Sequence, residues 1–173
     1  QNTIASLKNA VKNNFNAVEF DIWFIDGELY LSHDKPSSAS LEKLTRFRDY
    51  FIYGNKLDYW LDFKNLNEDN IALAINLVKK DLQENKIDLS KVFFAPYITD
   101  YDLAEKICHK IHQIMADKVN VLAVCDQNSQ LRQIIDLIDL QIFDFVSMDY
   151  NLISNELLQK LNSKKIFAWT VND

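Results

Sequence analysis

The chain has 173 residues, of which 48% are hydrophobic and 25% are charged, and its formal net charge is −6. These values are ordinary for a globular protein, and the acidic balance argues against a general nucleic-acid binder, whose surface must neutralise phosphates. No stretch approaches the roughly 20 apolar residues of a transmembrane helix. The length suggests a single domain over residues 1–173.

The first residues favour a helix. Asn2 and Thr3 are candidate N-caps, and apolar residues follow at helical spacing at Ile4, Leu7, Ala10 and Val11. We expect this helix to end at Asn13-Asn14, where a strand begins.

The stretch from Ala17 to Asp34 predicts a β-hairpin. Residues 18–25 alternate with the period of a strand. Asp26-Gly27 is a strong signal for a two-residue hairpin turn, because glycine adopts positive φ at no steric cost. The returning arm would bring His33 close to Glu19 and Asp21, two carboxylates on one face of the strand.

This juxtaposition suggests a metal site. Acidic side chains two residues apart repel each other unless a cation lies between them, and a hard divalent ion with oxygen ligands, Mg²⁺ or Ca²⁺, is the obvious candidate. A histidine beside such an ion suits proton transfer, since imidazole titrates near neutral pH. The alternative is a solvated polar strand face, on which His33 only closes the hairpin.

Beyond the hairpin, helices and strands are expected to alternate. A helix capped by Ser40 would carry Leu41, Leu44, Phe47 and Phe51 and stop at Gly54-Asn55. Strands are expected over residues 59–63, 92–95, 119–124, 143–148 and 165–171. Helices would follow the first four strands, capped by Asn67, Asp100, Ser129 and Ser154, with Glu68 and Asp69 in the first turn of the helix after Asn67.

Apolar strands that alternate with amphipathic helices predict a parallel sheet covered by helices. Six such strands and the hairpin arm give the profile of an α/β TIM (β/α)₈ barrel that lacks its first strand and its last βα unit. An open doubly wound sheet is the alternative, although no glycine-rich phosphate turn follows any strand.

Six further residues of chemical interest are interpreted as structural. Cys108 and Cys125 lie in apolar segments without metal-ligand spacing and are expected to be reduced and buried. His109 and His112 lie three residues apart on a helix without an apparent third ligand, so we expect them on a solvated helix face. Trp23 and Trp60 are interpreted as packing residues.

Several motifs occur in a recognisable order: Asn2-Thr3, Glu19-Phe20-Asp21, Asp26-Gly27, His33-Asp34, Asp62-Phe63-Lys64 and Trp169-Thr170-Val171-Asn172. With these motifs the chain resembles the glycerophosphodiester phosphodiesterases, within the phosphatidylinositol-phospholipase-C-like phosphodiesterase superfamily. The resemblance covers nearly the whole chain. It implies a metal-dependent hydrolase of lipid metabolism that cleaves glycerophosphodiesters to an alcohol and glycerol 3-phosphate at the mouth of a TIM barrel.

The resemblance also implies roles for individual residues. Glu19, Asp21 and Asp62 match the metal ligands of the family, and His33 matches one of its two catalytic histidines. Lys64 matches a lysine of the family that faces the phosphate of the substrate, a small-molecule phosphodiester. Trp169 matches an aromatic residue that lines the substrate pocket. A metal and a lysine would neutralise the non-bridging oxygens during cleavage.

The sequence departs from the family at several points. The other catalytic histidine of the family lies in a His-Arg-Gly motif that would precede position 1, and the family usually has Glu at the positions of Gln1 and Asp62. An insertion often found after the His-Asp pair is lacking, so we expect a more open mouth.

Three functions are compatible with the residues. The first is a glycerophosphodiester phosphodiesterase, the second a non-catalytic relative that binds metal and phosphate, and the third a phospholipase-D-type or lyase-type enzyme that uses a hydroxyl of its own substrate. A cytoplasmic location is expected, with export as the alternative. The head group of the substrate, the metal and the oligomeric state are not assigned by the sequence.

Overall fold

The computed structural model describes residues 2–51, 56–97, 100–138, 142–161 and 165–169. Its strands form one sheet in the order β3-β2-β1-β4-β5-β6-β7-β8. The strands are β1 (Ala17–Ile25), β2 (Glu28–Leu31), β3 (Thr45–Arg46), β4 (Asp58–Phe63), β5 (Val92–Pro96), β6 (Asn120–Cys125), β7 (Phe145–Asp149) and β8 (Lys165–Trp169). The helices are α1 (Ile4–Lys12), α2 (Phe47–Tyr50), α3 (Ile71–Glu84), α4 (Tyr101–Met115), α5 (Leu131–Ile138) and α6 (Asn155–Leu161).

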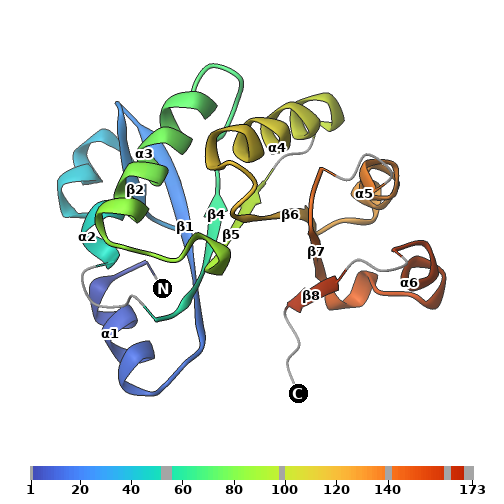
Figure 1. Ribbon diagram of the computed structural model, residues 1–173, viewed down its shortest axis with the longest axis horizontal. Coiled ribbons are helices and arrows are strands. Elements are labelled where there is room, and N and C mark those ends of the chain that lie inside the picture. Colours follow the sequence, from blue (N-terminus) through green and yellow to red (C-terminus); the bar gives the residue numbers. More distant parts are fainter. Residues whose placement is uncertain (1, 52–55, 98–99, 139–141, 162–164, 170–173) are drawn as a thin grey trace.

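The strand directions identify the architecture. Strands β1, β4, β5, β6, β7 and β8 are parallel, whereas β2 and β3 extend the β1 edge in antiparallel fashion. The parallel strands follow one another without the reversal of strand order that marks a doubly wound sheet. Helices α3 to α6 follow one another around the outside of the strands (Figure 1). The fold is therefore the predicted barrel, with six of its parallel strands among the described residues, and the doubly wound alternative is wrong.

The outer face of the strands forms the main core. Phe20, Tyr59 and Phe63 are fully buried on this face. Phe20 packs against the ring of Tyr50 in α2, with 4.6 Å between the ring centroids. Helices α3 and α4 add Ile75 and other apolar residues to the same core. Because burial of such side chains supplies most of the stability of a domain, this face holds the fold together.

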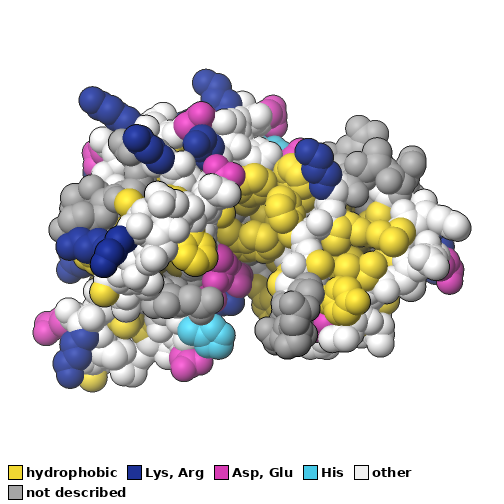
Figure 2. Space-filling view, turned by 90° about the horizontal axis from the view of Figure 1, so that it is seen from below, with side chains coloured by type: hydrophobic (Ala, Val, Ile, Leu, Met, Phe, Trp, Pro, Cys, Tyr) yellow, Lys and Arg dark blue, Asp and Glu magenta, His cyan; other side chains and the backbone are white. Residues whose placement is uncertain are grey.

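The inner face carries a second group of aromatic side chains. Phe93, Phe145 and Phe167 lie within 5.3–5.7 Å of one another between ring centroids, and Trp60 lies 5.6 Å from Phe167. All four are only partly buried. Figure 2 shows hydrophobic side chains gathered in the middle of one face of the molecule, beside acidic side chains and a histidine.

The predicted helix capped by Ser40 is wrong. Residues Ser38–Lys43 form a 3₁₀ helix, β3 follows at Thr45–Arg46, and α2 is a single turn. The physical reason is the free edge of β2, whose backbone groups pair with Thr45 and Arg46 and so interrupt the helical spacing. The expected stop at Gly54-Asn55 lies outside the described residues.

Two other predicted helix starts also differ. Asn67 accepts hydrogen bonds from the backbone N–H groups of Asp69 and Asn70, so it forms a turn and α3 begins only at Ile71. Glu68 and Asp69 therefore precede the helix. Ser129 lies within a short 3₁₀ segment before α5 and does not cap it.

The remaining helix caps are confirmed. Thr3 caps α1 in a capping box with Ser6. Asp100 accepts the N–H of Leu103 at 2.9 Å in α4, and Ser154 accepts the N–H of Leu157 at 3.1 Å in α6. No helix in the described part of the chain is long and apolar enough to cross a membrane.

The cysteine prediction is confirmed, and the histidine prediction holds for one residue. Cys108 and Cys125 are buried and free. His109 lies on an exposed part of α4, but His112 is only 20% exposed, with Nε2 at 3.1 Å from the carbonyl oxygen of Ile142. His112 therefore packs between helix and loop and is not solvated.

Candidate functional site

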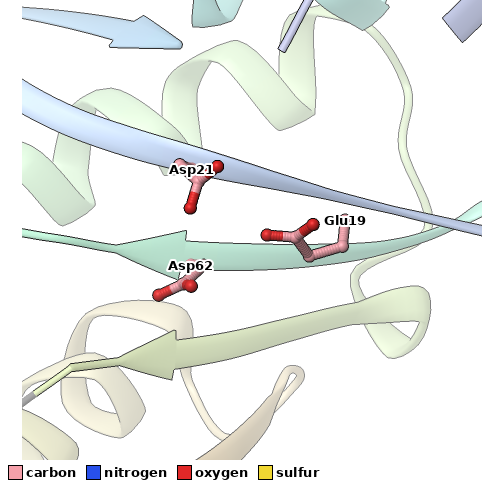
Figure 3. A group of neighbouring side chains, drawn as sticks. All are labelled: Glu19, Asp21 and Asp62. Carbon is pink, nitrogen blue, oxygen red and sulfur yellow. The ribbon is translucent and has the colours of Figure 1, made fainter. Parts of the chain in front are cut away.

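Three carboxylates converge where β1 and β4 pair. Asp21 lies opposite Asp62, and Glu19 lies opposite Trp60 in the parallel register. Because alternate residues of a strand share a face, Glu19, Asp21 and Asp62 all point to the inner side of the sheet. One carboxylate oxygen from each lies within 4.8 Å of the others, and Figure 3 shows the three groups facing the same space.

Lys64 links two of these carboxylates. Its Nζ lies 2.7 Å from Oδ1 of Asp21 and 2.6 Å from Oδ2 of Asp62. The other oxygen of Asp21 accepts a hydrogen bond of 2.8 Å from the amide of Asn2, which also accepts the backbone N–H of Asp21 at 2.9 Å. Asp21 is 2% exposed. Its carboxylate is therefore buried, charge-paired and fixed in direction.

The electrostatics of the cluster favour an additional cation. Burial, followed by repulsion from Asp21 and Asp62, raises the pKa of Glu19 to about 7. Burial also raises the pKa of Asp62 and outweighs its hydrogen bond to Lys64. For Lys64, burial opposes the charged form, but hydrogen bonds to both aspartates raise its pKa overall. One ammonium thus does not neutralise three carboxylates.

The hairpin holds His33 near this cluster. Asp26 and Gly27 have φ values of 50° and 80°, as a two-residue turn of type I′ requires. The returning arm pairs Leu31 with Ile22, and the N–H of Ser32 donates to the carbonyl oxygen of Asp21 at 3.2 Å. The prediction that the hairpin brings the Ser32-His33-Asp34 segment next to Asp21 is confirmed.

His33 itself lies at the rim. Its side chain is 74% exposed, and Nδ1 lies 3.1 Å from a carboxylate oxygen of Asp34. It lines the same cavity as Glu19 and Asp62. A carboxylate at Nδ1 favours the tautomer with the proton there, which leaves Nε2 as the nitrogen available for proton exchange.

The cavity joins the predicted site residues with residues from β5 to β8. It has a volume of about 530 Å³. It is lined by Glu19, His33, Trp60, Asp62, Lys64, Ala95, Tyr97, Val124, Asp126, Ser147 and Trp169. Trp169 donates from Nε1 to Oγ of Ser147 at 3.0 Å, so its ring is held in place. Trp60 also lines the cavity, so its interpretation as a packing residue alone is incomplete.

Sequence reasoning missed three contributors to this site. Asn2 was interpreted only as a cap and family marker, because its contact with Asp21 joins residues 19 apart in the chain. Tyr97 and Asp126 lie beyond the ends of β5 and β6. Asp126 had a usable signal, since it directly follows an apolar strand, as Asp62 lies near the end of one.

The fold and cavity define an α/β barrel protein with carboxylates and a lysine gathered at the C-terminal ends of its parallel strands. Several solved structures share this fold. A glycerophosphodiester phosphodiesterase from Parabacteroides distasonis aligns with a TM-score of 0.71 and 15% identity, over 100% of this chain and 78% of the other. An Oleispira antarctica phosphodiesterase in complex with the product sn-glycerol-3-phosphate aligns with a TM-score of 0.73 and 13% identity, over 99% and 79%.

The sequence matches no family model and no curated protein. At 13–15% sequence identity, the likeness to these solved structures shows that the fold is shared and nothing further. The family that the sequence motifs resemble is nevertheless the family found among the proteins that share this fold.

Proposed function

We propose that the chain is a metal-dependent phosphodiesterase of the glycerophosphodiester phosphodiesterase family, organised as one barrel domain, which releases an alcohol and glycerol 3-phosphate. The observation that carries the proposal is the presence of Lys64 and three carboxylates in one cavity of a fold shared with such enzymes. A phosphodiester is anionic, and its cleavage needs cationic groups around the non-bridging oxygens. The neighbour with bound sn-glycerol-3-phosphate supports this substrate class.

The carboxylate cluster fits a divalent metal. Glu19, Asp21 and Asp62 offer only oxygen ligands, which Mg²⁺ and Ca²⁺ prefer. Oδ1 of Asp62 is buried and has no hydrogen-bond partner among the described residues. When bound, the metal would supply charge neutralisation for the phosphate oxygens.

The other residues have distinct tasks. Lys64 holds its ammonium where it faces both the carboxylates and the phosphate, and Asn2 fixes the direction of the Asp21 carboxylate. His33 transfers a proton at the cavity rim, with Asp34 orienting its ring. Trp169 provides a fixed aromatic wall for the substrate.

The test is hydrolysis of glycerophosphocholine with Mg²⁺ or Ca²⁺, using a preparation that includes any native residues upstream of Gln1. Release of glycerol 3-phosphate, abolished in Asp21→Asn and retained in the matched surface variant Asp117→Asn, is the expected result. A cyclic phosphate product would indicate a lyase instead. Metal binding without turnover would indicate a non-catalytic relative, and absence of both would contradict the proposal.

A further inference from the structure

A fourth carboxylate, that of Asp126, lines the same cavity as Glu19 and Asp62 of the metal-ligand cluster. Asp126 follows β6, which is two strands away from β4 and its residue Asp62. Neighbouring strands lie about 4.8 Å apart, so the backbones of β4 and β6 are separated by about 10 Å. Asp62 and Asp126 both line the same cavity as Lys64. A ligand with its phosphate at Lys64 could therefore extend along the cavity toward Asp126.

The carboxylate of Asp126 is incompletely satisfied. Oδ2 accepts a hydrogen bond of 3.1 Å from the hydroxyl of Tyr97. Oδ1 is buried and has no hydrogen-bond partner among the residues that the structure describes. Within that same part of the chain, Asp126 forms no ion pair with a lysine, an arginine or a histidine. A buried oxygen of this kind gains strongly from a charged N–H donor.

The position of Asp126 is built into the turn after β6. The buried side chain of Gln130 accepts the backbone N–H groups of Asp126 and Gln127, at 2.9 and 3.2 Å. The carboxylate is thus held at the cavity wall and is not a mobile surface acid. Tyr97 and Trp169 line the same cavity, and aromatic faces attract cations.

We propose that Asp126, Tyr97 and Trp169 form a subsite for a primary ammonium group on the alcohol half of the phosphodiester. This inference rests on the proposed function, because it assigns the phosphate to the Lys64 side of the cavity. A primary ammonium brings both a positive charge and the N–H donors that Oδ1 lacks. A trimethylammonium group has no such donor, and a neutral polyol has no charge, so an ethanolamine head group is preferred over choline or glycerol.

The experiment is calorimetric titration of the whole chain with phosphoethanolamine, phosphocholine, glycerol 3-phosphate and ethyl phosphate at saturating Mg²⁺. We expect phosphoethanolamine to bind about tenfold or more tightly than ethyl phosphate, and Asp126→Asn to remove this preference while leaving ethyl phosphate binding unchanged. Tyr97→Phe, which leaves the charge in place, is expected to retain the preference. Asp117→Asn is the matched charge control, and melting curves check that each variant is folded.

Several results would overturn the subsite. These are failure of the wild type to bind phosphoethanolamine, equal binding of phosphoethanolamine and glycerol 3-phosphate, and an unchanged preference in Asp126→Asn. Hydrolysis of glycerophosphodiesters without any head-group preference would remove the subsite and leave the proposed function intact. A preference for phosphoethanolamine in binding, without any turnover, would support the subsite and contradict the proposed hydrolysis.

Discussion

Metal binding is expected to release a proton from Glu19. Because burial and the two neighbouring aspartates raise its pKa to about 7, the carboxyl is mainly protonated below that pH in the metal-free protein. A metal ligand must be ionised, so the ion has to displace this proton. With a pKa of about 7, about a tenth of the Glu19 side chains are ionised at pH 6 and about nine tenths at pH 8. The apparent metal affinity should therefore rise about tenfold over this interval from Glu19 alone.

The assay is titration calorimetry with Mg²⁺ or Ca²⁺ at pH 6, 7 and 8, in pairs of buffers with different ionisation enthalpies. Near pH 6 the buffer dependence should correspond to almost one proton released per ion bound, and near pH 8 to almost none. Glu19→Gln should bind metal more weakly and lose most of the pH dependence. If the affinity were independent of pH, or if Glu19→Gln kept the wild-type pH profile, the assignment of Glu19 as a ligand with a raised pKa would be refuted.

Three substitutions test other parts of the site. His33→Ala should lower kcat by about 100-fold or more. The melting temperature should stay nearly constant, because the side chain of His33 is mostly exposed. A near-normal kcat in steady-state hydrolysis would show that His33 is structural. Lys64→Met should lower the free energy of unfolding by about 1–3 kcal/mol, because Asp21 and Asp62 lose the ammonium group that they share. Urea titrations measure this change, and an unchanged unfolding midpoint would contradict the charge pairing. Gly27→Ala should cost about 1 kcal/mol because φ is +80°, and a thermal melt that matches the wild type would argue against the type I′ turn.

The fold was largely predictable because its signals are local. Each parallel strand is a short apolar run, and α1, α4 and α6 begin at side-chain caps, so local patterns located them. The segment around Thr45-Arg46 was not predictable in this way. Its short strand forms because β2 leaves a free edge, and this event depends on the assembled sheet and not on the spacing of Leu41, Leu44 and Phe47.

Local patterns alone predict the site only as far as its residues lie close in sequence, and Asp62, Lys64 and Trp169 of the cavity were predicted from the family resemblance instead. Glu19, Asp21 and His33 follow from strand periodicity and one turn. The pairing of Asp21 with Asp62 through Lys64 depends on the register of two strands about 40 residues apart in the chain, which no local pattern contains. Metal ligation and the catalytic role of His33 stay predictions, to be decided by the experiments above.

The tryptophan residues make the cavity optically distinct from the rest of the molecule. The chain has three of them. Trp60 and Trp169 line the cavity, and Trp23 donates from Nε1 to the carbonyl oxygen of Ser32, directly before His33. Helices α3 to α6 contain none. Intrinsic fluorescence excited at the indole band therefore reports on ligand entry, metal loading and the hairpin, and loosening of the outer helices would go unnoticed unless it reached the inner face of the barrel.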